Sequence, residues 1–499
     1  MQSMPIIQSQ MGSAKGDLDM LRTPDGVAEM YEPAMHASLA LETPVAFSEV
    51  IAALSYALDL TSKGSSGHTL RACLLGMRVG THLHLAPQQM ADLYYGLLLK
   101  DAGCSQNAAQ MCELMGMDET VCKRAARTFD WSRFELQQLR FVLRHAFGNK
   151  RVLGRAKGLA KLMMSRAKAG RYMMTTRCAA GARVAHKLGM SSETANAIRS
   201  LDEHWDGAGQ PEGLRGSNIP LLAQIRNIAQ NLEVVEQLTG RDGAIAVLVE
   251  RSGRWFDPQM VASVQRMHRD GDLWGDEPDE ELMQAVVDLE PRPRAVLAEE
   301  TALDDICSAF AEIIDAKSHY TFLHSREVAR HAVAIGVEMD LDEWELRDLR
   351  RAALLHDIGK LGVPNTVLDK AGELNADEWA ILRRHPADAY RLLRRIPGFE
   401  TIALIARSHH EKMDGSGYPD GLVASQLGVL ARILVVADVY DALSSKRPYR
   451  QDLTQEQVMA IMAADTPHAL DRDCFEALLR TLPNGKGLPN KTARRTWRL

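Results

Sequence analysis

The chain has 499 residues, of which 46% are hydrophobic, 25% charged and only 5% aromatic, and this composition excludes a collagen-like, low-complexity or wholly disordered protein. The formal net charge of −6 provides no basic excess for binding long nucleic acids. The seven cysteines are scattered without a Cys-X-X-Cys pair, and no apolar run approaches the roughly 18 residues of a membrane span. We therefore expect a cytoplasmic protein with reduced thiols that binds neither long nucleic acid nor membrane.

The predicted elements follow one another as two helical blocks. Residues 1–40 lack apolar periodicity and are expected to form a flexible leader. Residues 41–268 place apolar side chains three and four positions apart, as the buried face of a helix requires. The acid-rich stretch 269–298 predicts a solvated linker, and helical spacing returns over 299–485 before a basic tail at 486–499. No strands alternate with these helices, so the sequence predicts an all-α fold.

The two blocks share an internal repeat. DGAGQPEGL at 206–214 returns as DGSGYPDGL at 414–422, an offset of 208 residues. Upstream, GLLLKDAG at 96–103 matches AALLHDIG at 352–359, an offset of 256 residues. Matched blocks in the same order predict two tandem copies of one helical domain, and the change of offset indicates an insertion of about 48 residues in the first copy.

The second copy concentrates side chains that ligate metals. Its candidate ligands include adjacent His-Asp and His-His pairs and comprise His324, His356, Asp357, His385, His409, His410 and Asp438. If Asp357 bridges two ions, one ion takes His324, His356 and Asp438 and the other takes the remaining three histidines. Mixed imidazole and carboxylate ligands with open positions suit iron or manganese better than structural zinc. Two such ions would activate a water for attack on a phosphodiester.

The motifs HDIGKLGVP, HHEKMDGSGYPDGL, ADVYDAL and RPYR resemble those of the HD-GYP family, a branch of the HD metal-dependent phosphohydrolases. The resemblance implies a bundle of helices that hydrolyses cyclic di-GMP to pGpG and further to GMP, with two divalent ions, iron or manganese. It implies catalytic roles for Asp357 and Lys360, and phosphate or guanine contacts for Lys360, Arg447 and Arg450. The signature loop is Asp414, Gly415, Gly417, Tyr418 and Pro419. We interpret Tyr418 and Glu411 as structural supports.

The first copy has lost most of this chemistry. Only His68 and Asp101 remain of the seven ligands, and Cys104 stands at the position of Lys360. The repeat offsets place Lys100, Leu201, Asp202 and Gln230 at the positions of His356, His409, His410 and Asp438, and one gap near 195–199 places Cys178 opposite His385. We expect a degenerate, non-catalytic or regulatory domain at 41–268 and a catalytic domain at 299–485.

Two alternatives remain for the function. One is hydrolysis of another cyclic dinucleotide, such as 3′,3′-cyclic GMP-AMP. The other is a non-catalytic cyclic-nucleotide receptor or scaffold built from both copies. A homodimer or a signalling-protein partner is compatible with either.

Overall fold

The computed structural model describes residues 45–59, 67–107, 172–291, 300–318, 323–370, 372–445 and 452–482. Within these ranges the regular secondary structure is helical, apart from two isolated β-bridges, which confirms the predicted all-α fold. No helix in the same ranges combines the length and the apolar character needed to cross a bilayer. The expected leader at 1–40 and the basic tail at 486–499 lie outside the described residues.

In the first half of the chain, α4 (His68–His82) packs against α5 (Pro87–Leu98) and α11 (Leu221–Glu250). Helix α11 is interrupted at Gly240, where φ is 79°. This half also contains α3 (Phe47–Asp59), η2 (Cys104–Asn107), α10 (Ser192–Arg199), η3 (Gly216–Asn218), α12 (Pro258–Asp270) and α13 (Leu282–Asp288), and residues 172–187 are helical as well.

In the second half, α15 (His324–Glu338) packs against α16 (Glu343–Leu355), α21 (Val429–Ser444) and α23 (Arg472–Thr481). The other elements are α14 (Glu300–Asp315), η5 (Ile358–Gly362), α17 (Asn365–Leu368), α18 (Ala376–Leu382), α19 (His385–Leu393), α20 (Glu400–Arg407), η6 (Ala424–Gln426) and α22 (Gln455–Asp465).

Helix α16 shows how the sequence sets an element that leads into the site. It begins at a capping box, in which the Asp342 carboxylate accepts the N–H groups of Trp344 and Glu345, both at 2.8 Å. Its buried face includes Leu349 and Ala352, which hold the helix against the core. The helix therefore ends in a fixed place, directly before the His-Asp pair.

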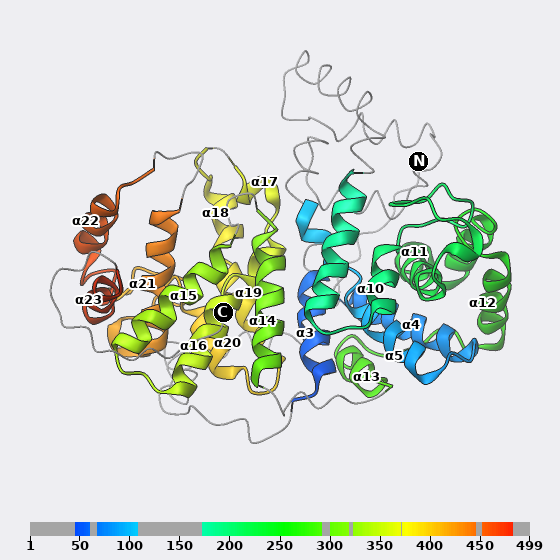
Figure 1. Cartoon of the computed structure of the whole chain (residues 1–499), viewed down its shortest axis with the longest axis horizontal. Helices are drawn as coiled ribbons and strands as arrows, with labels where there is room; N and C mark the ends of the chain where they lie inside the picture. Colours follow the sequence, from blue (N-terminus) through cyan, green and yellow to red (C-terminus); the bar gives the residue numbers. More distant parts are fainter. Residues whose placement is uncertain are drawn as a thin grey trace, which may run out of the picture.

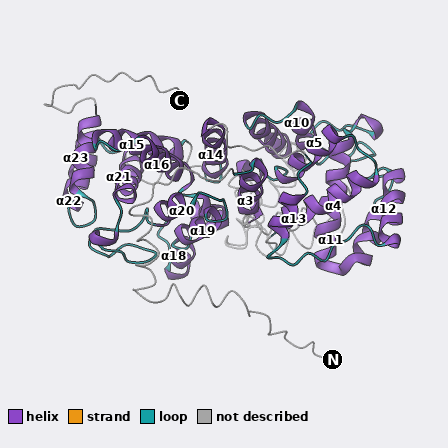
Figure 2. Cartoon of the chain, turned by 90° about the horizontal axis from the view of Figure 1, so that it is seen from below, coloured by secondary structure: helices purple, strands orange, loops and turns teal. Residues whose placement is uncertain are grey.

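The two halves lie side by side, with α3 and α14 facing each other between them (Figures 1 and 2). Helix α3 contacts η5 and α19 of the second half, and α14 contacts η2 of the first half. Lys187 of the first half pairs with Glu312 of α14 at 2.6 Å. Buried apolar side chains of both halves belong to one continuous cluster, so the first half supports the elements around the second half's site.

Local structures repeat at the offsets found in the sequence. The Asp59 carboxylate accepts the backbone N–H and the hydroxyl of Thr69. The Asp315 carboxylate, 256 residues later, accepts the same two groups of Ser325. Each pair ties the end of one helix to the start of the next, which carries His68 in the first half and His324 in the second.

One expected correspondence is wrong. The sequence alignment used a gap that placed Cys178 opposite His385. In the structure, a Cβ on Gly103 would lie 1.9 Å from the Arg177 carbonyl oxygen, and a Cβ on Gly359 would lie 2.0 Å from the His385 carbonyl oxygen. The equivalent of His385 is therefore Arg177, at an offset of 208 and without a gap.

The acidic stretch 269–298 was expected to be solvated, but its described part packs against the first half. Leu282 and Val286 of α13 are buried, and α13 contacts α3 and α4. The Asp279 carboxylate pairs with Arg71 of α4 at 3.0 Å. The apolar residues among the acids supply a buried helix face, which outweighs the solvating tendency of the charges.

Candidate metal centre

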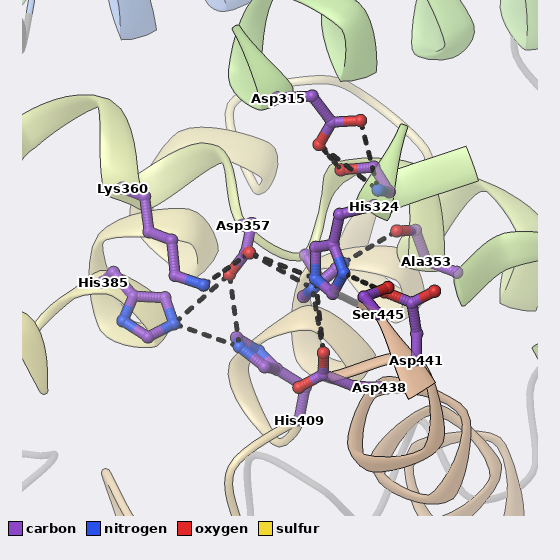
Figure 3. Close-up of polar contacts among 12 residues, drawn as sticks. Asp315, His324, Ala353, Asp357, Lys360, His385, His409, Asp438, Asp441 and Ser445 are labelled. Atoms are coloured by element: carbon purple, nitrogen blue, oxygen red, sulfur yellow. Dashed lines mark hydrogen bonds and ion pairs between the residues drawn. The ribbon is translucent and has the colours of Figure 1, made fainter. Parts of the chain in front are cut away.

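Five elements of the second half bring the seven predicted ligands together, and Figure 3 labels His324, Asp357, His385, His409 and Asp438 among them. His324 begins α15, the His356-Asp357 pair directly follows α16, and His385 begins α19. The His409-His410 pair follows α20, and Asp438 lies on α21. These side chains form three overlapping groups whose ligand atoms lie within 4.8 Å of one another.

The Asp357 carboxylate lies between two sets of imidazoles. Its Oδ2 is 3.6 Å from Nε2 of His324 and 3.5 Å from Nε2 of His356. Its Oδ1 is 3.4 Å from Nε2 of His385 and 3.6 Å from Nε2 of His409. One carboxylate thus presents a different oxygen to each set, which is the arrangement expected of a bridging ligand.

Three histidines are oriented by backbone carbonyls. In His356, His385 and His409, Nδ1 donates to the carbonyl oxygen three residues earlier, at 2.7, 2.7 and 2.6 Å. Because a carbonyl only accepts, the hydrogen of each neutral ring must be on Nδ1. The Nε2 lone pairs therefore point at the centre, and the Nε2 atoms of His385 and His409 are only 3.0 Å apart.

The fourth ring has a charged support that the sequence analysis missed. His324 Nδ1 bonds the Asp441 carboxylate at 2.7 Å, and its Nε2 is 3.3 Å from Asp438. Burial alone would lower the pKa of His324, but these two carboxylates raise it to about 10. The repeat held a signal for this residue, since Glu233, 208 residues earlier, bonds His68.

The electrostatics favour cations at the centre. Burial would raise the pKa of Asp357, but Lys360 and the surrounding histidines hold it well below its usual range. Burial lowers the pKa values of His385 and His409 well below the usual range of histidine. A charged carboxylate and neutral imidazoles are the forms that bind divalent ions.

Two buried ligand atoms, His356 Nε2 and Asp357 Oδ1, have no hydrogen-bond partner within the described ranges. Leaving such atoms unpaired is costly in a protein interior. Two divalent ions would satisfy both atoms, so the residues present fit the metals that the resemblance implies.

Lys360 points inward rather than to solvent. Its Nζ donates to Asp357 Oδ2 at 2.6 Å, and its side chain is 22% exposed. The ammonium therefore lies at the edge of the centre, within reach of the same carboxylate that faces both imidazole sets.

The signature loop is held by Glu411. Its carboxylate accepts the N–H groups of Asp420, Gly421 and Leu422 at 2.7, 3.2 and 3.0 Å. A Cβ on Gly417 would lie 2.5 Å from Glu411 Cα, so only glycine fits there. Glu411 is thus a support for the loop, as predicted.

The remaining loop residues divide between the turn and the centre. Gly415 has φ of 77°, and the exposed Asp414 accepts the N–H of Ser416 within its own turn at 2.9 Å. The Tyr418 ring lies 4.8 Å from the His410 ring, and its peptide bond to Pro419 is cis. The loop therefore reaches the candidate metal ligands through Tyr418.

A second residue that the sequence analysis missed is Arg383. Its guanidinium lies 5.3 Å from the centroid of the Tyr418 ring, and the same ring also contacts His410. Arg383 lies directly after α18, beside Arg384, and nothing in the sequence pattern distinguishes it for such a position. The predicted substrate contacts Arg447 and Arg450 lie outside the described residues.

Comparisons with known proteins agree with this geometry. A family model described as HD domain matches residues 165–260 and 308–474. The chain is 37% identical over 435 residues to 3′3′-cGAMP-specific phosphodiesterase 3 of Vibrio cholerae, covering 87% of this chain and 94% of that protein. It is 38% identical over 204 residues to the cyclic di-GMP phosphodiesterase response regulator RpfG of Xanthomonas campestris, covering 40% of this chain and 54% of that protein.

A solved structure agrees as well. The crystal structure of a cyclic GMP-AMP specific phosphodiesterase of V. cholerae superposes with a TM-score of 0.58 at 32% identity, covering 88% of this chain and 98% of that one. Both the family model and a relative matched over nearly its whole length support the same assignment. The chain belongs to the HD domain family and, within it, to the HD-GYP proteins.

Proposed function

We propose that the protein is a metal-dependent phosphodiesterase that hydrolyses a 3′,3′-linked cyclic dinucleotide and so lowers the level of a second messenger. The strongest support is that the two oxygens of the Asp357 carboxylate face different histidines. Oδ2 faces His324 and His356, and Oδ1 faces His385 and His409. A shared carboxylate between two sets of ligands is the design of a two-metal hydrolytic site. When bound, two divalent ions, iron or manganese, would activate water and neutralise charge on the phosphoryl group.

The chain's own residues prepare the site for that chemistry. The rings of His356, His385 and His409 present fixed Nε2 lone pairs, because backbone carbonyls hold their Nδ1 atoms. Asp441 holds Nδ1 of His324. Lys360 supplies a positive charge beside Asp357, where it can turn to a phosphate oxygen of the substrate. Tyr418 contacts both the His410 ring and the Arg383 guanidinium, so it joins the signature loop to the edge of the centre.

We propose 3′,3′-cyclic GMP-AMP as the preferred substrate. The relative aligned over 94% of its length is named for that nucleotide. Cyclic di-GMP, favoured by the sequence motifs, remains the second candidate, because RpfG is named for it at a similar identity.

The first half, 41–268, is proposed to be non-catalytic. It keeps His68 and Asp101, but Lys100, Arg177 and Gln230 stand at the positions of His356, His385 and Asp438. A lysine and an arginine cannot serve as ligands while charged, so this half lacks the ligands for two ions.

The test is hydrolysis of both nucleotides, side by side, by the full chain purified anaerobically. We expect a linear dinucleotide product from at least one of them, faster from 3′,3′-cyclic GMP-AMP, and none from the Asp357→Asn variant. Nucleotide binding without hydrolysis by metal-loaded protein would contradict the proposal and favour a receptor.

A further inference from the structure

The first half carries a buried cluster of cations at the place where the second half carries its metal ligands. Lys100 replaces His356 and donates to Asp101, and its side chain is fully buried. Arg177 replaces His385 and pairs with Asp202 at 2.7 Å. Each of these carboxylates therefore already has a cationic partner.

Arg226 is a third cation in this cluster, and it has no such partner. It lies on α11, is fully buried, and none of its three guanidinium nitrogens has a hydrogen-bond partner in the part of the chain that the structure describes. Asp101, Asp202 and Arg177 act on it electrostatically, so its charge lies near theirs. A buried guanidinium with five unused N–H donors is an expensive arrangement unless an anion completes it.

The fold makes room for this arginine. The equivalent of Arg226 in the second half is Leu434, 208 residues later. A Cβ on Gly96 would lie 3.4 Å from Arg226 Cδ, and the second half has Ala352 at the position of Gly96. The first half thus differs from the second both in the cation and in the small residue beside it.

Gln230 adds a second unsatisfied group. It stands at the position of Asp438, and its buried amide oxygen has no partner among the described residues. Rotation of the amide would present an N–H donor from the same position. The edge of the cluster meets solvent at the Arg177–Asp202 pair, whose side chains are 22% and 21% exposed.

We propose that Lys100, Arg177 and Arg226 form a metal-free binding site for a phosphate-bearing anion in the first half. Arginine is suited to phosphate because its planar fork donates two parallel hydrogen bonds. The ligand is either free phosphate or the phosphodiester of a nucleotide. The site binds without hydrolysing, because no nucleophile is activated there. The inference goes beyond the proposed hydrolysis and does not depend on it.

The test counts phosphate ions bound to the metal-loaded full chain, using labelled inorganic phosphate over a concentration series. The variant is Arg226→Leu, which installs the second half's own residue. The control is Arg199→Leu, which removes one exposed charge, paired with Glu212 at 3.0 Å, from the same half.

We expect Arg226→Leu to lose one bound phosphate per chain, or to bind it at least about tenfold more weakly, whereas Arg199→Leu matches the wild type. Arg226→Leu should lose one bound phosphate per chain whether or not the second half also binds phosphate. The result can therefore be interpreted even if the chain does not hydrolyse cyclic dinucleotides. Equal phosphate binding by the wild type and Arg226→Leu overturns the proposal.

Stability gives an independent check. Without phosphate, Arg226→Leu should be at least as stable as the wild type, because it removes an unpaired buried charge. Marked destabilisation, or failure of the variant to fold, would show that Arg226 is satisfied within the protein and would overturn the site.

Competition on ice then identifies the source of the anion. Cyclic di-GMP or 3′,3′-cyclic GMP-AMP that displaces the Arg226-dependent phosphate at lower concentration than unlabelled phosphate would indicate a nucleotide. Displacement by unlabelled phosphate alone would indicate the free anion. Either result supports the site.

Discussion

The backbone contact between Gly359 and His385 predicts a specific failure in the Gly359→Ala variant. The new Cβ would lie 2.0 Å from the His385 carbonyl oxygen, whereas an ordinary carbon–oxygen contact is about 3.3 Å. Helix α19 must therefore move by about 1 Å relative to η5. Such overpacking costs about 1–3 kcal/mol of unfolding free energy, and a misplacement of that size costs about a hundredfold in rate.

The chain supplies a matched control in Gly103→Ala. A Cβ there would lie 1.9 Å from the Arg177 carbonyl oxygen, so the same strain arises in the half that lacks the metal ligands. Thermal unfolding, metal content and kcat/KM for the cyclic dinucleotide are measured on both variants. We expect similar losses of stability, with loss of metal and activity only in Gly359→Ala. Wild-type metal content and activity in Gly359→Ala, or equal losses of both in Gly103→Ala, would refute the reasoning.

Three further predictions test individual side chains. Asp441→Asn removes the charge that supports His324 Nδ1 and should weaken metal binding about 10- to 100-fold in chelator competition; unchanged affinity would remove Asp441 from the site. Burial lowers the pKa of His331 to about 4. As pH falls, this histidine therefore takes up a proton in the unfolded chain before it does so in the folded chain. The free energy of unfolding should fall by up to about 3 kcal/mol between about pH 6.5 and pH 4. That pH-dependent loss should be absent in His331→Gln. If the pH–stability curves of the wild type and His331→Gln run parallel, the prediction is wrong. Glu411→Gln should lower the free energy of unfolding by about 2 kcal/mol and slow hydrolysis. Glu203→Gln disturbs the matching loop of the first half, so it should lower the free energy of unfolding by the same amount and leave hydrolysis unchanged.

The fold was predictable because its signals are local. Apolar spacing of three and four residues specifies each helix, and the repeat specifies which helices correspond. The buried side of α13 was missed, because the acids around Leu282 and Val286 dominate the composition of that stretch. Ion pairs such as Asp279–Arg71 allow these acids to lie against the first half.

The clustering of the candidate ligands was predictable because adjacent His-Asp and His-His pairs stand out beside apolar helical segments. The sequence could not show which Asp357 oxygen faces which histidine, since that depends on how the helices that carry these residues pack in three dimensions. It also could not decide the equivalent of His385, because a one-residue gap costs little in an alignment. The contact of Gly103 with Arg177 decides it, and this replacement of a ligand by a cation is what reveals the cationic cluster.

The supports behind the ligands were the least visible part of the sequence. Asp441 and Asp315 are ordinary helix residues by pattern, yet one bonds His324 and the other holds the start of α15. The repeat contained their counterparts, Glu233 and Asp59, at the same offsets. Comparing the two halves for shared acids would have found both.

The most direct test of the account is the number of metal ions per chain in full-length protein purified anaerobically. We predict two iron or manganese ions in the wild type, one in His324→Ala, one in His410→Ala, and fewer than one in Asp357→Asn, because the Asp357 carboxylate faces both sets of ligands. A single ion in the wild type, or two ions retained in Asp357→Asn, would contradict the shared carboxylate.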